Sequence, residues 1–118
     1  MNRLDEIEAR ANAATEGPWV TYTVTPHMGS EVLTAPREGE DYGDYVVPEY
    51  IDMDNAEFIA HARTDVPALV AALKKVLELH QETTISLGHG LLQRQCVCGS
   101  AWPCLTVAAI RRHLGDDL

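Results

Sequence analysis

The fold of the C-terminal end of this chain is predicted from one short stretch, Cys96-Val97-Cys98-Gly99-Ser100-Ala101-Trp102-Pro103-Cys104. It contains all 3 cysteines of the 118 residues. Three thiolates this close together, with a histidine nearby, are what a small zinc site needs. The sequence therefore predicts that a structural Zn²⁺ gathers these sulfurs and shapes an end of the molecule that is too small to fold unaided.

The predicted zinc ligands are three thiolates and one imidazole, from Cys96, Cys98, Cys104 and His89. Thiolate sulfur binds zinc in tetrahedral geometry, and Gly99 allows the tight backbone turn that neighbouring ligands require. A catalytic zinc site also needs an open position and an activating carboxylate, and the sequence has no His-Glu-x-x-His pattern. Three free thiols, or a disulfide formed on oxidation, are the alternatives to a metal site.

The choice of the fourth ligand depends on the positions of the histidines. His89 stands between Gly88 and Gly90, so its backbone can adapt to a metal. His113 is the alternative fourth ligand, although it is more than two helical turns beyond the last cysteine. His80 falls on the apolar side of a predicted long helix and is expected to be a core histidine.

Composition excludes several classes of function. The net charge of −9 argues against general binding to nucleic acid, because phosphate would repel the protein. No run of apolar residues is long enough for a membrane span, and the charged N-terminus does not predict a signal peptide. Clustered thiols without an export signal favour a reducing compartment, so a cytoplasmic location is expected.

Acidic residues are concentrated between Glu38 and Glu57, where the sequence has no lysine or arginine. Such a stretch could imitate the phosphates of DNA and capture a basic protein. The candidate partner-binding carboxylates are those of Glu38, Glu40, Asp41, Asp44, Glu49 and Asp52. The alternative is a solvated loop that only keeps a small protein soluble.

Hydrophobic periodicity predicts an α+β fold. A helix is expected over residues 4–14, followed by a three-stranded antiparallel sheet from Trp19–Thr25, Glu31–Ala35 and Asp44–Val47. A helix pair follows at residues 54–62 and 66–80, because Thr64-Asp65-Val66-Pro67 is typical of a helix start. Residues 83–95 are expected to be a linker, and residues 106–114 a last short helix.

The predicted organisation is an α+β domain of residues 1–82 and a zinc-knuckle-like tail of residues 83–118 packed on it. The apolar side of the long helix could also support a homodimer, although a single-domain core would use the same residues.

Two motifs in the same order resemble the ead-like accessory proteins of tailed phages, over about residues 4–80. They are Ala13-Ala14-Thr15-Glu16-Gly17-Pro18-Trp19 and Asn55-Ala56-Glu57-Phe58-Ile59-Ala60-His61-Ala62-Arg63-Thr64-Asp65-Val66-Pro67-Ala68-Leu69. Similar segments occur in small proteins of actinobacteria and their phages, and the Cys-x-Cys and Trp102-Pro103-Cys104 tail is similar to another actinobacterial pattern. The resemblance implies no catalytic residue. It implies that Pro18 and Trp19 pack against Phe58 and Ile59.

The resemblance leads us to expect a non-enzymatic phage accessory protein that binds and modulates a host macromolecule in the host bacterial cytoplasm, for host takeover or counter-defence. An alternative is a small-molecule binder that sequesters a nucleotide signal of host immunity, through Arg37, Arg63 or the Arg111-Arg112 pair. A third is an uncharacterised enzyme in which Cys98 or Cys104 acts with a histidine, although no flanking motif supports it.

Overall fold

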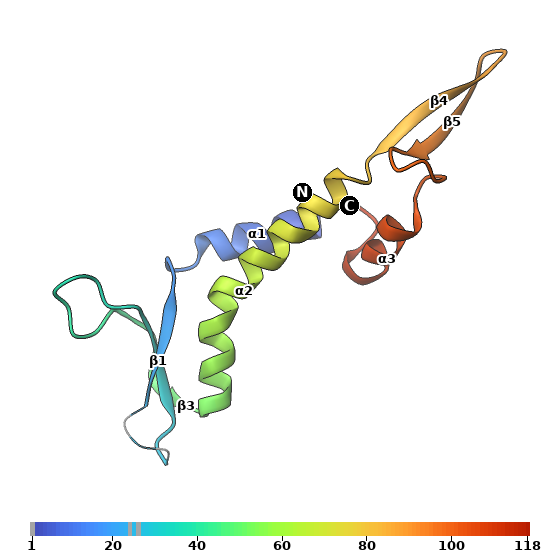
Figure 1. Cartoon of the computed structure of the whole chain (residues 1–118). Coiled ribbons are helices and arrows are strands. Elements are labelled where there is room, and N and C mark those ends of the chain that lie inside the picture. The colour runs from blue at the N-terminus through green and yellow to red at the C-terminus, as the bar shows by residue number, and fades with distance from the viewer. Residues whose placement is uncertain (1, 24, 26) are drawn as a thin grey trace. The chain divides into compact units, whose positions relative to one another are not determined.

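The computed structural model describes residues 2–23, 25 and 27–118 (Figure 1). Within them the order of elements is α1 (Arg3–Ala13), β1 (Trp19–Thr23), β2 (Ser30–Thr34), β3 (Tyr45–Ile51), α2 (Met53–Glu78), β4 (Glu82–Gly88), β5 (Leu91–Cys96) and α3 (Leu105–Leu114). The α+β class is confirmed: the strands form one three-stranded and one two-stranded antiparallel sheet, accompanied by helices.

The chain divides into two compact units. Glu8–Leu69 forms the first, which we call the sheet unit, and residues 2–7 with Val70–Leu118 form the second, which we call the Cys unit. Both α1 and α2 contribute residues to each unit. The boundary predicted from the sequence, after residue 82, lies inside the Cys unit.

In the sheet unit the predicted antiparallel meander is present, with strand order β1-β2-β3. The first strand was predicted to reach Thr25, whereas β1 ends at Thr23; Val24, and Pro26 of the predicted turn, lie outside the described residues. β3 extends beyond its predicted end and contains Pro48. Because β3 is an edge strand, the missing N–H of proline need not disrupt the sheet.

One face of this sheet packs against α2 and forms the core of the unit. The buried centre consists of Val32, Ala56 and Ala60, and the partly buried residues around it are Trp19, Val46, Val47, Ile51 and Ile59. Trp19 and Ile59 therefore pack against the same buried core, whereas Pro18, which was expected to join them, is exposed. Phe58, however, is 76% exposed, so the prediction that it packs in the core is wrong. Ala56, Ile59 and Ala60 follow the i, i+3, i+4 spacing of one helix face, and Phe58 lies off that face.

The predicted helix pair is wrong, because α2 is one helix that continues through Pro67. Thr64 does not act as a cap; its hydroxyl donates to the carbonyl oxygen of His61 within the helix. Proline inside a helix loses one backbone hydrogen bond, but the alanines and leucines on either side are strong helix formers. At the start of α2, Asp52 accepts the N–H of Asp54 and its carbonyl receives the N–H of Ala56.

Two glycines provide a stability test of the sheet unit. Gly29 and Gly39 both have positive φ angles, of 84° and 85°. A Cβ at Gly29 would lie 2.1 Å from the carbonyl oxygen of Ile51, whereas a Cβ at Gly39 would meet nothing within 4 Å. We expect Gly29→Ala to lower the free energy of unfolding by more than about 2 kcal/mol and Gly39→Ala by about 1 kcal/mol. Urea unfolding followed by circular dichroism measures both, and equal losses would contradict the described packing of Ile51.

In the Cys unit, the segment expected to be a linker is a β-hairpin. β4 and β5 pair in antiparallel register from Glu82–Cys96 to Gly88–Leu91. The guanidinium of Arg94 on β5 donates two hydrogen bonds to the carboxylate of Glu82 on β4, and this partner lowers the pKa of Glu82. The last helix is confirmed as α3, followed by Gly115 as its C-cap. No helix among the described residues is long and apolar enough to cross a membrane.

Candidate metal centre

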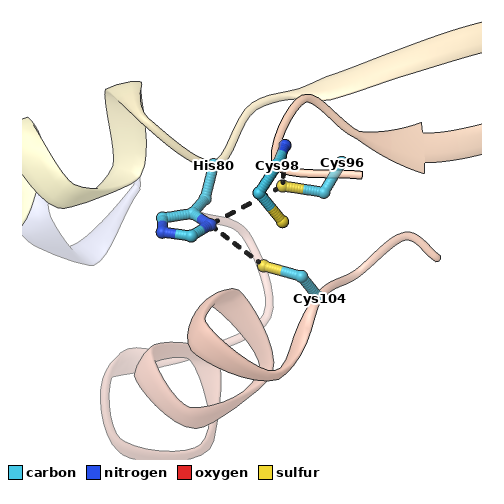
Figure 2. Close-up of side chains that lie close together, drawn as sticks. All are labelled: His80, Cys96, Cys98 and Cys104. Carbon is cyan, nitrogen blue, oxygen red and sulfur yellow. Dashed lines mark hydrogen bonds between the residues drawn. The ribbon is translucent and has the colours of Figure 1, made fainter. Parts of the chain in front are cut away.

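Four side chains of the Cys unit converge on one point. They are His80, Cys96, Cys98 and Cys104, and their ligand atoms all lie within 4.8 Å of one another. Figure 2 shows the three sulfurs and the imidazole turned toward the same space. This cluster, which we call the Cys3His cluster, could hold a metal ion.

The local fold explains why residues distant in sequence meet here. His80 follows the C-terminal end of α2, just before β4, and the hairpin returns the chain so that Cys96 pairs with Glu82. A tight turn then presents Cys98, because the N–H of Gly99 donates to the carbonyl of Cys96 at 2.8 Å. Gly99 has a φ of 101°, which an L side chain rarely adopts. Cys104 is the N-cap residue of α3.

Two of the distances between ligand atoms are close to those of tetrahedral coordination. Nδ1 of His80 lies 3.7 Å from Sγ of Cys96 and 3.4 Å from Sγ of Cys104. With zinc–sulfur bonds of about 2.3 Å and zinc–nitrogen bonds of about 2.0–2.1 Å, the ligand atoms of a tetrahedral site lie about 3.6–3.8 Å apart. The backbone N–H of Cys98 points at Sγ of Cys96 at 3.5 Å, a contact that stabilises negative charge on the sulfur.

Burial and hydrogen bonding act in opposite directions on the thiols. Burial raises the pKa of Cys96 to about 11, whereas a hydrogen bond from the Ser100 backbone, followed by the Cys96 and His80 side chains, lowers the pKa of Cys98 to about 6. Cys96 and Cys104 are buried and Cys98 is exposed, and all three are free thiols. The cluster therefore holds one readily ionised sulfur at its surface and an inner one whose proton a metal would have to displace.

The cluster is also part of the core of the Cys unit. The buried residues of that core are Cys96, Cys104 and Val107, with Leu77 and Trp102 packed against them. Two of the three buried residues are thus candidate ligands. Leu4 and Val70 are the other buried apolar residues of this unit among those described, so ordinary apolar packing is limited, which is the situation in which a bound metal contributes most to folding.

The three predicted cysteine ligands come together, but the predicted histidine does not. His89 lies in the tight turn of the hairpin, with φ of 51°. Because β5 separates it from Cys96, it is about 17–20 Å away at 3.3 Å per strand residue. His113 is in α3 and lies about 13 Å along the helix from Cys104 at 1.5 Å per residue. His80 takes the fourth position instead.

The sequence does contain a pattern that could have identified His80 as a ligand, but it lies in residues 83–95, which were predicted to be a linker. Residues 82–87 are rich in β-branched side chains, and glycines at 88 and 90 precede a second short segment that begins with Leu91 and Leu92. Two such runs joined by a short glycine-containing loop predict a hairpin. A hairpin brings its two ends together, so a histidine just before its first strand lies beside a cysteine at the end of its second.

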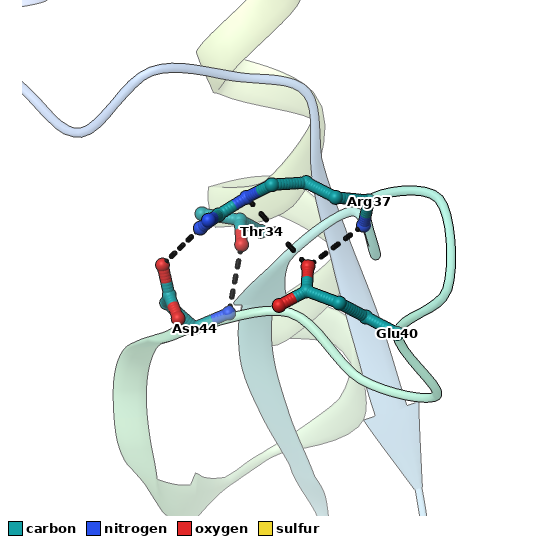
Figure 3. A network of polar contacts seen from close by, with 4 residues as sticks. All are labelled: Thr34, Arg37, Glu40 and Asp44. Atoms are coloured by element: carbon teal, nitrogen blue, oxygen red, sulfur yellow. Dashed lines mark hydrogen bonds and ion pairs between the residues drawn. The ribbon is translucent and has the colours of Figure 1, made fainter.

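The acidic candidates lie in the sheet unit, away from this cluster in the chain, and all six are exposed. Arg37, which precedes the acidic stretch, forms ion pairs with Glu40 and Asp44 (Figure 3). The N–H of Asp44 donates to Oγ1 of Thr34 at 2.8 Å, which ties the loop to β2. Arg37 therefore offsets part of the charge of this stretch. The remaining candidates are Glu38, Asp41, Glu49 and Asp52.

No family model matches this chain, and the comparisons with curated proteins and with solved structures found no match.

Proposed function

We propose that this is a zinc-stabilised, non-enzymatic binding protein whose Cys3His cluster holds a structural Zn²⁺. The convergence of four zinc-type ligand atoms within 4.8 Å carries the proposal. Three thiolates and one imidazole complete a tetrahedral sphere and leave no position for water or substrate. Such a closed site supports a structural role rather than a catalytic one.

The four residues would join three elements of the Cys unit. His80 fixes the end of α2, Cys96 and Cys98 fix the hairpin and its turn, and Cys104 fixes the start of α3. Zinc binding would stabilise the folded unit, in which few apolar residues are buried. The other side chains near the cluster position the ligands: Trp102 and Leu77 pack around them.

Metal analysis of the purified, reduced protein tests the zinc proposal. We expect about one zinc per chain, and we expect His80→Ala to lose most of it because an imidazole ligand disappears. His89→Ala is the matched control and should retain the metal, since His89 lies in the hairpin turn. A wild-type content below about half a zinc per chain, or a loss caused by His89→Ala instead, would overturn the assignment.

We further propose that the protein is a phage accessory protein that acts on a host macromolecule in the bacterial cytoplasm, and that its partner is a basic protein. Support comes from the resemblance of residues 4–80 to ead-like proteins and from the net charge of −9. Glu38, Asp41, Glu49 and Asp52 offer exposed carboxylates to such a partner. The nucleotide-binding alternative is less favoured, because three of its four arginines already have partners: Arg37 pairs with acids, Arg63 donates to the carbonyl of Thr15, and Arg111 donates to the carbonyl of Leu118.

Capture of host proteins from a lysate tests the partner proposal. The wild-type protein should retain a basic host protein, and a variant with lysine at positions 38, 41, 49 and 52 should lose it. A variant with lysine at the exposed positions of Glu6, Glu16, Asp65 and Glu78 changes the net charge equally and should keep the partner. Loss in both variants, or a bound nucleotide in place of a protein, would contradict the proposal.

A further inference from the structure

The Cys unit contains a pocket of about 500 Å³ that the proposed zinc site does not use. All the residues that line it come from the two segments of this unit, so the pocket lies within one unit. Its apolar walls are formed by Leu4, Leu77, Trp102, Val107 and Leu118. Sites for small organic molecules usually measure about 300–1,000 Å³ and combine apolar walls with a few polar groups. The size and the lining of this pocket, which we call the Trp102 pocket, therefore fit a small ligand.

Trp102 carries an unexplained polar atom at the wall of this pocket. Its indole Nε1 is buried and has no hydrogen-bond partner among the described residues. A buried N–H group without an acceptor costs about 1–3 kcal/mol. The other tryptophan has its acceptor, because Nε1 of Trp19 donates to the carbonyl of Thr15 at 3.1 Å. An acceptor is thus missing beside Trp102 but not beside Trp19.

A second N–H group at the wall of the Trp102 pocket comes from His80. Nδ1 of His80 contacts the sulfurs of Cys96 and Cys104, and Figure 2 shows the other ring nitrogen, Nε2, on the side of the ring away from them. When a metal occupies Nδ1, Nε2 carries the proton, and such an N–H normally donates to a carboxylate, a carbonyl or water. The described part of the chain supplies no acceptor for it.

The acidic side chains around the pocket are engaged elsewhere. Each carboxylate that lines it forms an ion pair, and the pairs are Asp5 with Lys74, Glu78 with Lys75 and Glu82 with Arg94. Two hydrogen bonds also hold the carboxylate of Glu82 on Arg94. These acids are therefore not the acceptors of the two N–H groups in this structure.

Arg111 adds a positive charge next to the indole. It lines the pocket, and its guanidinium carbon lies 5.4 Å from the centroid of the Trp102 ring. Its hydrogen bonds to the carbonyl of Leu118 come from Nε and Nη2, so Nη1 is left to meet a ligand. Basic and acidic residues are equally numerous in the Cys unit, so the surplus of negative charge lies in the sheet unit. An anion near Arg111 is therefore compatible with the acidic character of the whole chain.

We propose that the Trp102 pocket binds a small organic carboxylate with an apolar body. The apolar body would lie against Leu4 and Leu77, and the carboxylate would accept the N–H groups of Trp102 and His80 beside Arg111. A carboxylate suits these groups because it only accepts hydrogen bonds and has two oxygens for several donors. Since Nε1 is shielded from solvent, its bond forms with a small side-chain adjustment of the pocket wall. The inference goes beyond the proposed function and depends on zinc only for the proton on Nε2 of His80.

NMR of the isotope-labelled, full-length, zinc-loaded protein tests this site. The probe is phenylacetate; phenylacetamide has the same ring without the charge, and acetate has the charge without the ring. We expect phenylacetate to move the indole N–H signal of Trp102 downfield and to leave that of Trp19 in place, because the Trp19 N–H is already bonded to Thr15. Phenylacetamide and acetate should each bind at least about tenfold more weakly, since one loses a charge-assisted hydrogen bond and the other loses apolar contact.

Matched variants separate this site from unspecific binding. Trp102→Phe keeps an aromatic ring but removes the N–H, and it should weaken phenylacetate binding about tenfold. Arg111→Gln should weaken it about tenfold as well, because the positive charge disappears. Arg112 is the next residue, is exposed and does not line the pocket, so Arg112→Gln should bind within about twofold of the wild type.

The wild-type indole signals and the two arginine variants decide the matter even if Trp102→Phe does not fold. A Trp102 signal that phenylacetate leaves unmoved, equal shifts of both indole signals, or equal weakening by Arg111→Gln and Arg112→Gln would overturn the inference.

This inference and the proposed function can fail separately. A protein that contains zinc, but whose Trp102 signal does not respond to phenylacetate, overturns the pocket inference alone. A protein that binds phenylacetate at Trp102 but contains no zinc overturns the metal assignment alone.

Discussion

Replacing Cys104 by serine is expected to release the metal and to unfold much of the Cys unit. Cys104 is a candidate ligand and one of the buried core residues, and it begins α3. Changes in groups that merely orient a ligand typically cost 10- to 100-fold in metal affinity, so losing a ligand should cost more than about 100-fold. At a metal concentration about 1,000 times the dissociation constant, binding contributes about 4 kcal/mol to stability, and the variant would lose this contribution.

Thermal unfolding of the zinc-loaded proteins, with and without a chelator, measures this effect. The chelator should destabilise the wild type strongly and the Cys104→Ser variant hardly at all, because the variant holds little metal. Leu105→Ser is the control: its side chain is the next in the chain and is 89% exposed, so both metal and stability should persist. A Cys104→Ser protein that keeps its zinc and its midpoint would disprove the role of this cysteine.

Replacing Trp19 by alanine is expected to be the most damaging aromatic substitution in the sheet unit. Trp19 packs against the Val32, Ala56 and Ala60 core and donates from Nε1 to the carbonyl of Thr15 at 3.1 Å. The guanidinium carbon of Arg63 lies 5.9 Å from its ring centroid. Truncating a buried aromatic residue costs about 3–5 kcal/mol, so this half-buried one should cost about 2–3 kcal/mol.

Phe58→Ala is the matched comparison for Trp19→Ala. Phe58 is 76% exposed, and surface substitutions usually change stability by less than about 0.5 kcal/mol. Circular dichroism during heating should show a midpoint lowered by about 8 °C or more for Trp19→Ala and little change for Phe58→Ala. Similar losses for both would mean that Phe58 lies in the core, as the resemblance to ead-like proteins implied.

Local patterns predicted most of the secondary structure of the sheet unit and α3. Alternation at Trp19–Thr23 gave the first strand, and apolar spacing gave α3. These signals succeed because they depend on residues close in sequence. Pro67 misled the prediction, since a proline that starts a helix and a proline inside one look alike until the packing of both sides is known.

The sequence predicted the three cysteines of the candidate site but not its histidine, again because local patterns are easier to interpret than long-range pairing. The cysteines are near one another in sequence, so their convergence is a local property. His80 reaches them only through the pairing of β4 with β5, and apolar periodicity made it look like a core residue.

X-ray absorption at the zinc edge of the purified protein tests the central claim most directly. A Cys3His centre predicts three sulfur atoms at about 2.3 Å and one nitrogen at about 2.0–2.1 Å around a single zinc. His80→Ala should change only the nitrogen contribution in whatever metal remains. A spectrum with only oxygen and nitrogen neighbours, or four sulfurs, would contradict the assignment of His80, Cys96, Cys98 and Cys104 as one metal site.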